Sequence, residues 1–532
     1  MKRVIIPALC FLVVVASASA QFKMSEGSKK VATAMAIIEN LYVDDVNDGK
    51  LAEDAIKSLL EKLDPHSTYI GTDEVKDMNE PLEGNFDGIG ISFNMMTDTL
   101  YVIEALAGGP SEKAGIMAGD KILYINDTLI AGVKKPTKYV MSRLKGPKGT
   151  KVDIKVLRRG VSGLLDFKIT RAKIPVYSID ASYMVDNNTG YIRVIRFGAT
   201  TTKEFQDAIA KLRKQGLKNL ILDLESNGGG YMAPAIDLSD EFLSKDKLIV
   251  YTEGLRQPRR DEAATEKGNF EDGKLVIMIN EGSASASEIL SGAVQDWDRG
   301  VIVGRRSFGK GLVQRQIPLP DESMIRLTVA RYYTPTGRSI QKPYTSGDIT
   351  SYNMDVIERY NKGEMMHADS IHFPDSLKYT TLTNKRTVYG GGGVMPDYFV
   401  PLDTANYTPY FKSIANRGLI YKVAYSEVDN HRKDILHEYP TKEAFVSKYV
   451  VPQSLLDRVI AAGEEEKIAY REDEFGKASD LIKMQLKMLL ARDVYDTETS
   501  LRIYNENSGI FKKAYEIINN NDLYNSLLGH EK

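Results

Sequence analysis

Short segments that are apolar at nearly every position recur between residue 174 and about residue 400; they lie at 190–194, 220–224, 275–279 and 301–303. A strand with one face in water alternates apolar and polar residues, whereas a strand that is covered on both faces does not. Helical patterns stand between these segments, at 202–215, in a long stretch from Met232 and after Ser285. This region therefore predicts an α/β sheet with helices on its faces.

The whole chain is too long for a single core, since it has 532 residues and a domain holds roughly 100–200. Apolar residues at helical spacing precede a region of short strands and glycine-rich turns, and a charged helical region ends the chain. We expect a multidomain α/β and α+β protein. Its parts are a leader (1–20), an N-terminal helical segment (21–80), a compact strand-rich domain (81–173), the α/β core (174–402) with a polar, irregular insertion (346–387), and a C-terminal helical domain (403–532).

The first twenty residues have the pattern of a cleaved signal peptide. Lys2 and Arg3 precede an apolar run at 4–15, and Ala18-Ser19-Ala20 supplies small residues for cleavage. A membrane anchor is the alternative, but the run is shorter than the ~20 residues that cross a bilayer. Cys10 lies in the middle of the run, which disfavours a lipoprotein. We expect an exported protein of the periplasm or cell envelope.

Charge and cysteine content exclude several classes of function. Basic and acidic residues number 70 and 72, so the chain lacks the basic excess of a general nucleic-acid binder. The single cysteine lies in the leader, so the mature chain has no disulfide, no thiolate metal site and no cysteine nucleophile. We expect neither a metal nor a cofactor.

Three stretches in the strand-rich region carry a specific pattern. They are Gly88-Ile89-Gly90-Ile91, the run from Ala114 to Asn126 that contains Ala118-Gly119-Asp120, and the alternating strand at 151–158. Together they resemble a PDZ domain. The resemblance implies that the amides of Gly88, Ile89, Gly90 and Ile91 grip a C-terminal carboxylate while the peptide adds as a strand, with Ile89 and Ile91 lining the side-chain pocket. The alternative is that these glycines only turn a hairpin.

A serine cluster, Ser283-Ala284-Ser285-Ala286-Ser287, stands between a buried strand and a helix. A hydroxyl there lies beside a helix N-terminus, which favours a developing anion, although helix capping is the commoner reason for serine at such a junction. A serine nucleophile needs a base, and no histidine occurs between 66 and 367. Lys310, between Gly309 and Gly311, can serve if burial lowers its pKa.

The same lysine ends a stretch, 304–310, that matches the start of a phosphate-binding loop. Such a loop needs a Ser or Thr after the lysine and then a helix. Gly311 follows instead, and 312–319 has the pattern of a strand. The nucleotide-binding alternative is therefore disfavoured.

The order of leader, N-terminal helices, PDZ pattern, Ser-Ala-Ser-Ala-Ser-Glu-Ile and Phe-Gly-Lys-Gly-Leu-Val-Gln resembles the carboxyl-terminal processing proteases over about residues 30–402. The resemblance implies a ClpP/crotonase-like α/β serine protease core. It makes Ser285 the nucleophile and Lys310 the general base. It also implies that Gln314 orients the lysine, and it places Asp296 at the site as in some family members.

A second motif of this family resembles Leu222-Asp223-Leu224-Glu225-Ser226-Asn227 and the glycines that follow it, with Glu225 where arginine is usual. The resemblance implies an oxyanion hole, which we assign to the amides of Gly229 and Ala286. The departure at Glu225 puts any arginine-mediated contact in doubt. The four glycines at 390–393 also match the family, and we expect them to serve backbone packing.

These features predict an exported serine endopeptidase that recognises C-terminal tails of protein or peptide substrates and cleaves them with a Ser–Lys dyad. The alternative is a catalytically silent PDZ scaffold that binds tails without cutting. An adaptor or lipoprotein partner and a homo-oligomer formed through the terminal helical segments both stay open.

Overall fold

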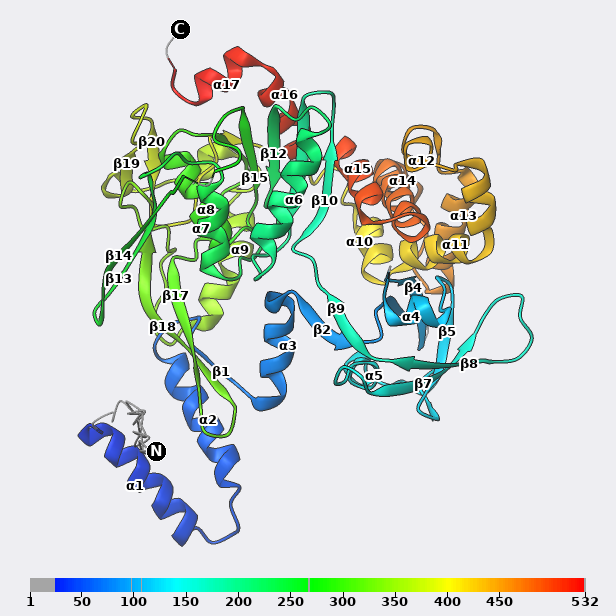
Figure 1. Cartoon of the computed structure of the whole chain (residues 1–532), viewed down its shortest axis with the longest axis horizontal. Helices are drawn as coiled ribbons and strands as arrows, with labels where there is room; N and C mark the ends of the chain where they lie inside the picture. Colours follow the sequence, from blue (N-terminus) through cyan, green and yellow to red (C-terminus); the bar gives the residue numbers. More distant parts are fainter. Residues whose placement is uncertain (1–23, 97, 107, 267, 531–532) are drawn as a thin grey trace, which may run out of the picture.

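The computed structural model describes residues 24–530 except 97, 107 and 267, so the expected signal peptide lies outside the described residues. Within the described part, the catalytic core, the PDZ domain and a helical bundle form three bodies, and a pair of N-terminal helices projects from the core (Figure 1). No helix among the described residues is long and apolar enough to cross a membrane.

A six-stranded sheet forms the centre of the core, in the order β10-β11-β12-β15-β16-β21. The edge strand β10 is antiparallel to β11, and every other neighbouring pair is parallel. The strands are β10 (Ile179–Met184), β11 (Thr189–Val194), β12 (Asn219–Asp223), β15 (Leu275–Ile279), β16 (Val301–Gly304) and β21 (Tyr398–Phe399). All five side chains of β15 are buried, which confirms the expectation from its apolar sequence.

Helices cover both faces of this sheet. On one face lie α6 (Thr201–Arg213), α7 (Met232–Asp240) and α8 (Ala286–Asp296). On the other lie α16 (Gly509–Asn519) and α17 (Asn521–Leu527), whose Phe511, Ile517 and Tyr524 pack against the sheet. The end of the chain is thus part of the core, and only the helices before it form the separate bundle expected over 403–532. The helix from Met232 is also shorter than expected, with nine residues.

A second sheet stands beside the first and carries the loop with the candidate base. Its order is β1-β18-β13-β14, and β17 also pairs with β18. Its strands are β1 (Thr68–Ile70), β13 (Leu248–Gly254), β14 (Gln257–Ala263), β17 (Leu312–Pro318) and β18 (Met324–Tyr333). Strand β1 comes from the N-terminal segment, so this segment is built into the core.

The region 346–387, expected to be irregular, contains ordered elements. They are α9 (Ile349–Asn361), two short 3-10 turns (Ala368–Ser370 and Asp375–Leu377), and the hairpin of β19 (Lys378–Thr380) and β20 (Thr387–Tyr389). Arg359 of α9 donates to the carbonyls of Arg306 (2.7 Å) and Ser307 (3.0 Å). The insertion therefore braces the loop that leads to Lys310.

The PDZ domain is a sheet in the order β3-β4-β5-β7-β8, with two small helices. Strands β2 and β9 pair with each other and connect it to the core. Its elements are β2 (Asn85–Gly88), β3 (Ile91–Met96), β4 (Thr99–Ala105), α4 (Pro110–Ala114), β5 (Lys121–Ile125), β6 (Thr128–Leu129), α5 (Thr137–Leu144), β7 (Lys151–Leu157), β8 (Leu165–Thr170) and β9 (Ala172–Pro175). Strand β3 is at the edge of its sheet, so one of its sides is open to strand addition.

The C-terminal helical bundle packs around its own apolar core. Its helices are α10 (Pro409–Asn416), α11 (Leu419–Glu438), α12 (Lys442–Lys448), α13 (Gln453–Glu465), α14 (Glu472–Val494) and α15 (Thr497–Asn507). Helix α11 lies against the PDZ domain. Arg159 donates to the carbonyl of Asp429 and to Asn430 Oδ1, both at 2.6 Å, and the rings of Tyr101 and Tyr425 meet edge to face at 4.7 Å.

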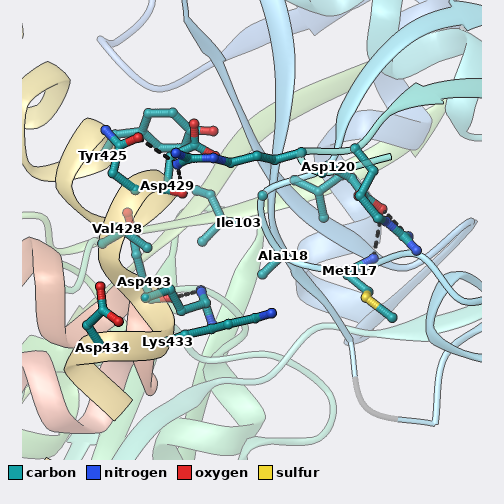
Figure 2. Close-up of a pocket in the computed structure, with 17 residues that line it drawn as sticks. Ile103, Met117, Ala118, Asp120, Tyr425, Val428, Asp429, Lys433, Asp434 and Asp493 are labelled. Atoms are coloured by element: carbon teal, nitrogen blue, oxygen red, sulfur yellow. Dashed lines mark hydrogen bonds and ion pairs between the residues drawn. The ribbon is translucent and has the colours of Figure 1, made fainter. Parts of the chain in front are cut away.

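This seam between the PDZ domain and the bundle holds a cavity of about 550 Å³ that is lined by both charged and apolar side chains (Figure 2). Ile103, Met117 and Asp120 line it from the PDZ side, and Asp429 and Lys433 from the bundle.

The N-terminal segment begins with α1 (Glu26–Leu41) and α2 (Asp48–Glu61) and continues through β1 to α3 (Thr72–Glu83). Helix α1 buries none of its residues, and Ile37, Leu41 and Val43 are exposed. Figure 1 shows this helix pair projecting from the body of the protein. Helix α3 runs between the core and the PDZ domain.

Candidate active site

Ser285 lies at the turn between β15 and α8, as the last residue before the helix. Its backbone has φ 56° and ψ −111°, a conformation that costs a residue with a side chain of order 1–3 kcal/mol. Such a turn lifts the side chain out at the edge of the sheet, beside the positive end of the α8 dipole. Ser283 and Ser287 differ from it, because both are fully buried and donate to the carbonyls of Leu224 (2.7 Å) and Asn227 (2.9 Å).

Lys310 lies on the loop between β16 and β17, and strand β17 follows where a phosphate-binding loop would need a helix. Burial and the nearby Arg326 lower the pKa of Lys310 to about 8, although the carboxylates of Glu288 and Asp64 act in the opposite direction. A substantial fraction of the amine is therefore neutral near pH 8, as a general base requires. Gly309 has φ +89°, and a Cβ there would lie 3.1 Å from the amide of Gly393.

Glu288 joins the serine helix to the lysine loop. Its buried carboxylate accepts hydrogen bonds from the amides of Ser285 (2.8 Å), Gly309 (2.7 Å) and Lys310 (2.9 Å), and from the hydroxyl of Ser307 (2.5 Å). Burial raises the pKa of this carboxyl to about 7, although the four donors favour its charged form. The sequence analysis did not single out Glu288, although a Glu three residues after a helix-capping Ser signals a contact of this kind.

Ser285 and Lys310 line one cavity of about 550 Å³. The cavity lies where the first sheet, α8 and the β17–β18 hairpin meet. Its other lining residues are Leu82, Gly228, Gly229, Gly230, Tyr231, Met232, Ala286, Ile289, Leu312, Val313, Gln314, Gln316, Arg326 and Tyr332. Arg326 brings a positive charge to this cavity, and the sequence analysis missed it because β18 carries no motif.

Gly229 and Ala286 both lie beside Ser285, and the structure separates their roles. A Cβ on Gly229 would lie 2.9 Å from the Ser285 Cβ and 3.1 Å from the Ala286 amide nitrogen. The Ala286 amide donates no hydrogen bond to any described residue. The Gly229 amide instead donates to Asn227 Oδ1 at 2.9 Å, so it is not free to bind an oxyanion in this conformation. The adjacent Gly228 and Gly230 amides donate to none of the described residues.

Gln314 lines the cavity, but its amide does not hydrogen-bond to Lys310 among the described residues. Its Nε2 donates to the carbonyl of Leu312 (3.1 Å) and to Thr328 Oγ1 (3.4 Å). Gln314 is therefore held by hydrogen bonds to β17 and β18 and not by one to Lys310.

Asp296 lies outside this cavity. It ends α8, about 16 Å along the helix axis from Ser285 at 1.5 Å per residue. Its carboxylate pairs with the fully buried Arg338 at 2.8 Å and accepts from the amide (2.9 Å) and hydroxyl (2.8 Å) of Thr336. The structure thus gives Asp296 a structural ion pair in place of the site role implied by the family resemblance.

Glu225, at the position where the family usually has arginine, is buried outside the cavity. Burial, together with the neighbouring Asp223 carboxylate, raises the pKa of Glu225 to about 8. The 390–393 glycines pack against the lysine loop: a Cβ on Gly393 would lie 2.7 Å from the carbonyl oxygen of Ser307. This contact agrees with a role in backbone packing.

The four PDZ residues singled out in the sequence lie together at a second cavity, of about 260 Å³. Gly88, Ile89, Gly90 and Ile91 form the turn from β2 into β3 and line this cavity. Phe93 of β3 and Met141 and Leu144 of α5 line it as well. Ile89 is buried in the domain core, and Gly90 has φ +73°. The cavity therefore joins an apolar pocket to the open edge of β3.

The described residues include no group of three or more His, Cys, Asp or Glu side chains that could hold a metal ion. Burial together with Lys310 lowers the pKa of His66 to about 4. Lys310 and Glu288, with pKa values of about 8 and about 7, are two groups near Ser285 that titrate close to neutral pH.

A serine on a strained strand-to-helix turn, with a buried lysine in its cavity and a PDZ domain on the same chain, is the arrangement of a serine-type peptidase that acts on peptides or proteins with C-terminal tails. Comparison with known families agrees. Residues 188–351 match peptidase family S41, 88–169 match the PDZ domain, 13–74 match the activating protease CtpB N-terminal domain, and 410–496 match a family of unknown function, DUF8443.

Curated relatives identify the family. The carboxy-terminal-processing protease of Bartonella bacilliformis is 40% identical over 309 residues, which are 57% of this chain and 70% of the relative. The carboxy-terminal processing protease CtpA of Bacillus subtilis is 34% identical over 62% of this chain and 71% of the relative. A solved photosystem II D1 C-terminal processing protease is 28% identical over 61% of this chain and 92% of its own, with a TM-score of 0.34. The chain belongs to the carboxy-terminal processing protease family.

Proposed function

We propose that this peptidase is an exported endopeptidase that cleaves with a Ser285–Lys310 dyad through an acyl-enzyme. The observation that carries the proposal is the pairing of a strained serine with a buried, pKa-lowered lysine in one cavity. Glu288 binds the backbone amides of both residues, so the two have a fixed spacing.

The chemistry follows from these positions. Neutral Lys310 takes the proton of Ser285 Oγ as the oxygen attacks the scissile carbonyl, and the lysine then gives that proton to the leaving amine. The acyl-enzyme forms as the peptide bond breaks, and water hydrolyses it with Lys310 again acting as base.

The carbonyl oxygen becomes an anion during attack and needs donors. The free Ala286 amide at the N-terminus of α8 supplies one. The glycine loop at 228–230 supplies a second once an amide turns toward the cavity. For Gly229, this requires release from Asn227 Oδ1.

The PDZ cavity supplies the tail specificity. We expect a C-terminal carboxylate at the amides of the 88–91 turn, with the last apolar side chain between Ile91 and Met141. The remainder of the substrate is then held at high local concentration near Ser285.

Export rests on the first twenty residues, and we assign the enzyme to the periplasm or cell envelope. Sequencing of the mature N-terminus tests this assignment, and Gln21 is expected as the first residue.

The exposed apolar side chains of α1 suit association with a second copy of the chain, which sedimentation of the purified protein measures.

The experiment that separates a protease from a silent PDZ scaffold compares Ser285→Ala with wild type on an unstructured protein that has an apolar C-terminus. We expect cleavage by wild type and none by the variant. Ser291→Ala is the matched control, because this buried serine of α8 donates only to the helix carbonyl of Ser287. Equal cleavage by wild type and Ser285→Ala would remove Ser285 from the mechanism.

A further inference from the structure

The turn Asp64-Pro65-His66-Ser67, which ends the N-terminal helices, lies behind the lysine of the catalytic core. The next three residues form β1, which pairs with β18 so that Thr68 lies opposite Arg326. Strand β18 therefore has a strand of the N-terminal segment on one side and β17, with Gln314, on the other. The turn therefore lies next to β18, whose Arg326 lines the active-site cavity, although the turn is remote from the site in sequence.

Asp64 is the centre of the turn and is 5% exposed. Its Oδ1 accepts from the amides of His66 (2.9 Å) and Ser67 (3.0 Å) and from Thr328 Oγ1 (2.9 Å), and its Oδ2 accepts from Ser67 Oγ (2.5 Å). The Thr328 amide donates back to Ser67 Oγ at 3.0 Å. The turn and β18 are thus joined by buried hydrogen bonds, which are costly to leave unmade.

The chain of contacts continues to the cavity. Thr328 Oγ1, which donates to Asp64, accepts from Gln314 Nε2 at 3.4 Å, and the two residues are opposite each other in the β17–β18 pairing. His66 Nε2 lies 2.9 Å from the hydroxyl of Tyr352, whose ring meets the ring of Phe308 edge to face at 5.9 Å. Phe308 lies two residues before Lys310 on the same loop. The turn therefore connects to strand β17, which follows Lys310, through Thr328 and Gln314, and to the lysine loop itself through Tyr352 and Phe308.

We propose that this turn positions the general base. Asp64, through its contacts with Thr328 and Gln314, fixes the side of the cavity that Gln314 shares with Lys310, and it places a negative charge near the lysine. The inference rests on the proposed role of Lys310 as base. It makes the N-terminal segment a functional part of the protease site in addition to any role in assembly.

The charges that face Lys310 come from three directions. Arg326 on β18 disfavours the protonated amine, whereas Glu288 on α8 and Asp64 on the turn favour it. His66 is neutral above about pH 5, because burial and Lys310 lower its pKa to about 4. Removing the Asp64 charge therefore leaves Arg326 opposed by Glu288 alone, and the lysine should lose its proton at a lower pH.

The test is the pH profile of kcat/KM for Asp64→Asn. We expect its alkaline-rising limb to move to lower pH by about 0.5 unit. We also expect a fall of about tenfold in plateau kcat from the disturbed side of the cavity. KM should stay within about twofold, since Asp64 does not line the substrate cavity. Glu61→Gln removes an exposed acid three residues away and is the control, with the limb expected at its wild-type position.

A second pair keeps the proposal testable if Asp64→Asn does not fold. Thr328→Val removes the hydroxyl between Asp64 and Gln314, and Thr328→Ser keeps it. We expect kcat to fall about tenfold in the first and to stay near wild type in the second. Equal kcat in this pair, or an unmoved limb in folded Asp64→Asn, would overturn the inference. Full activity of Lys310→Arg would instead overturn the proposed base itself, so the two failures can be told apart.

Discussion

A lysine removes a proton from serine only in its neutral form, and an exposed lysine is almost fully protonated at neutral pH. In this enzyme burial and Arg326 together bring the pKa of Lys310 to about 8, against the opposing charges of Glu288 and Asp64. The glycines on either side of the proposed base serve this burial, because they let the neighbouring backbone approach closely and exclude water.

The first prediction concerns pH. We expect kcat/KM to rise with pH to a plateau, with an apparent pKa of about 8, because only neutral Lys310 is active. Activity at pH 6 should be at least about a hundredfold below the plateau. Glu288, with a pKa of about 7, acts in the same direction, since its charged form accepts the four hydrogen bonds. Initial rates between pH 5.5 and 10 check this, and a flat profile would contradict it.

Lys310→Arg should be nearly inactive, because arginine stays protonated.

At this scale the sequence predicted the reactive side chains but not their partners. Ser285 and Lys310 stand in motifs, and the structure brings them to one cavity. Gly229 shows the limit: an Asn two residues earlier can accept from a backbone amide in an Asx turn, but only the structure shows that Asn227 occupies the Gly229 amide. Asp296 shows another, since only the length of α8 reveals how far this carboxylate lies from Ser285.

At the scale of elements, the junction between α8 and the 307–311 loop holds the site together. One buried carboxylate, Glu288, accepts four hydrogen bonds at this junction. Three come from the loop and one comes from the Ser285 amide. Each Glu288 oxygen accepts from two donors, so a neutral amide of the same shape must turn its own NH2 group toward two of the four.

We therefore expect Glu288→Gln to lower the free energy of unfolding by about 1–3 kcal/mol, since a buried donor loses its partner. We also expect kcat to fall more than KM changes, because the spacing of Ser285 and Lys310 is disturbed while the substrate cavity remains. Denaturant unfolding and steady-state kinetics measure the two effects. Glu281→Gln is the comparison, because this acid pairs with Arg305 outside the cavity. Equal kcat in Glu288→Gln and wild type would exclude this positioning role.

Elements were predictable where periodicity is strong and unpredictable where tertiary packing decides. The apolar strands β12, β15 and β16 were expected, and so was a helix after Ser285. The insertion was not, because α9 has a polar sequence and is held in place by Arg359 and Tyr352, which are buried. Helices α16 and α17 look like the other helices of the charged tail, and only their apolar faces against the sheet assign them to the core.

At the scale of the whole molecule, the PDZ domain lies between two neighbours. Strands β2 and β9 connect it to the core, and helix α11 of the bundle contacts its other side through Arg159. The cavity lined by β3, α5 and the 88–91 turn shares no lining residue with the cavity at the seam. The tail site is thus separate from the contact with the bundle.

We expect Met141→Glu to slow cleavage of substrates with an apolar C-terminus by at least about tenfold, because tethering is lost. Met141 is 38% exposed, so the domain should fold, and the new carboxylate disfavours both an apolar side chain and a second carboxylate. A short peptide without such a terminus should be cut at the wild-type rate. Leu157→Glu, at an exposed position on β7, is the control. Equal slowing of both substrates would show that the domain gates the site as well as tethering.

The most direct test of the Ser285–Lys310 dyad is covalent labelling by a serine-directed phosphonofluoridate, followed by mapping of the adduct. The reagent needs only a nucleophile and its base, since Ser285 Oγ displaces fluoride as Lys310 takes the proton. The account predicts one adduct, on Ser285, at a rate that rises with an apparent pKa of about 8 and is almost lost in Lys310→Met. An adduct on another residue, or equal labelling of Ser285 in Lys310→Met, would contradict the account.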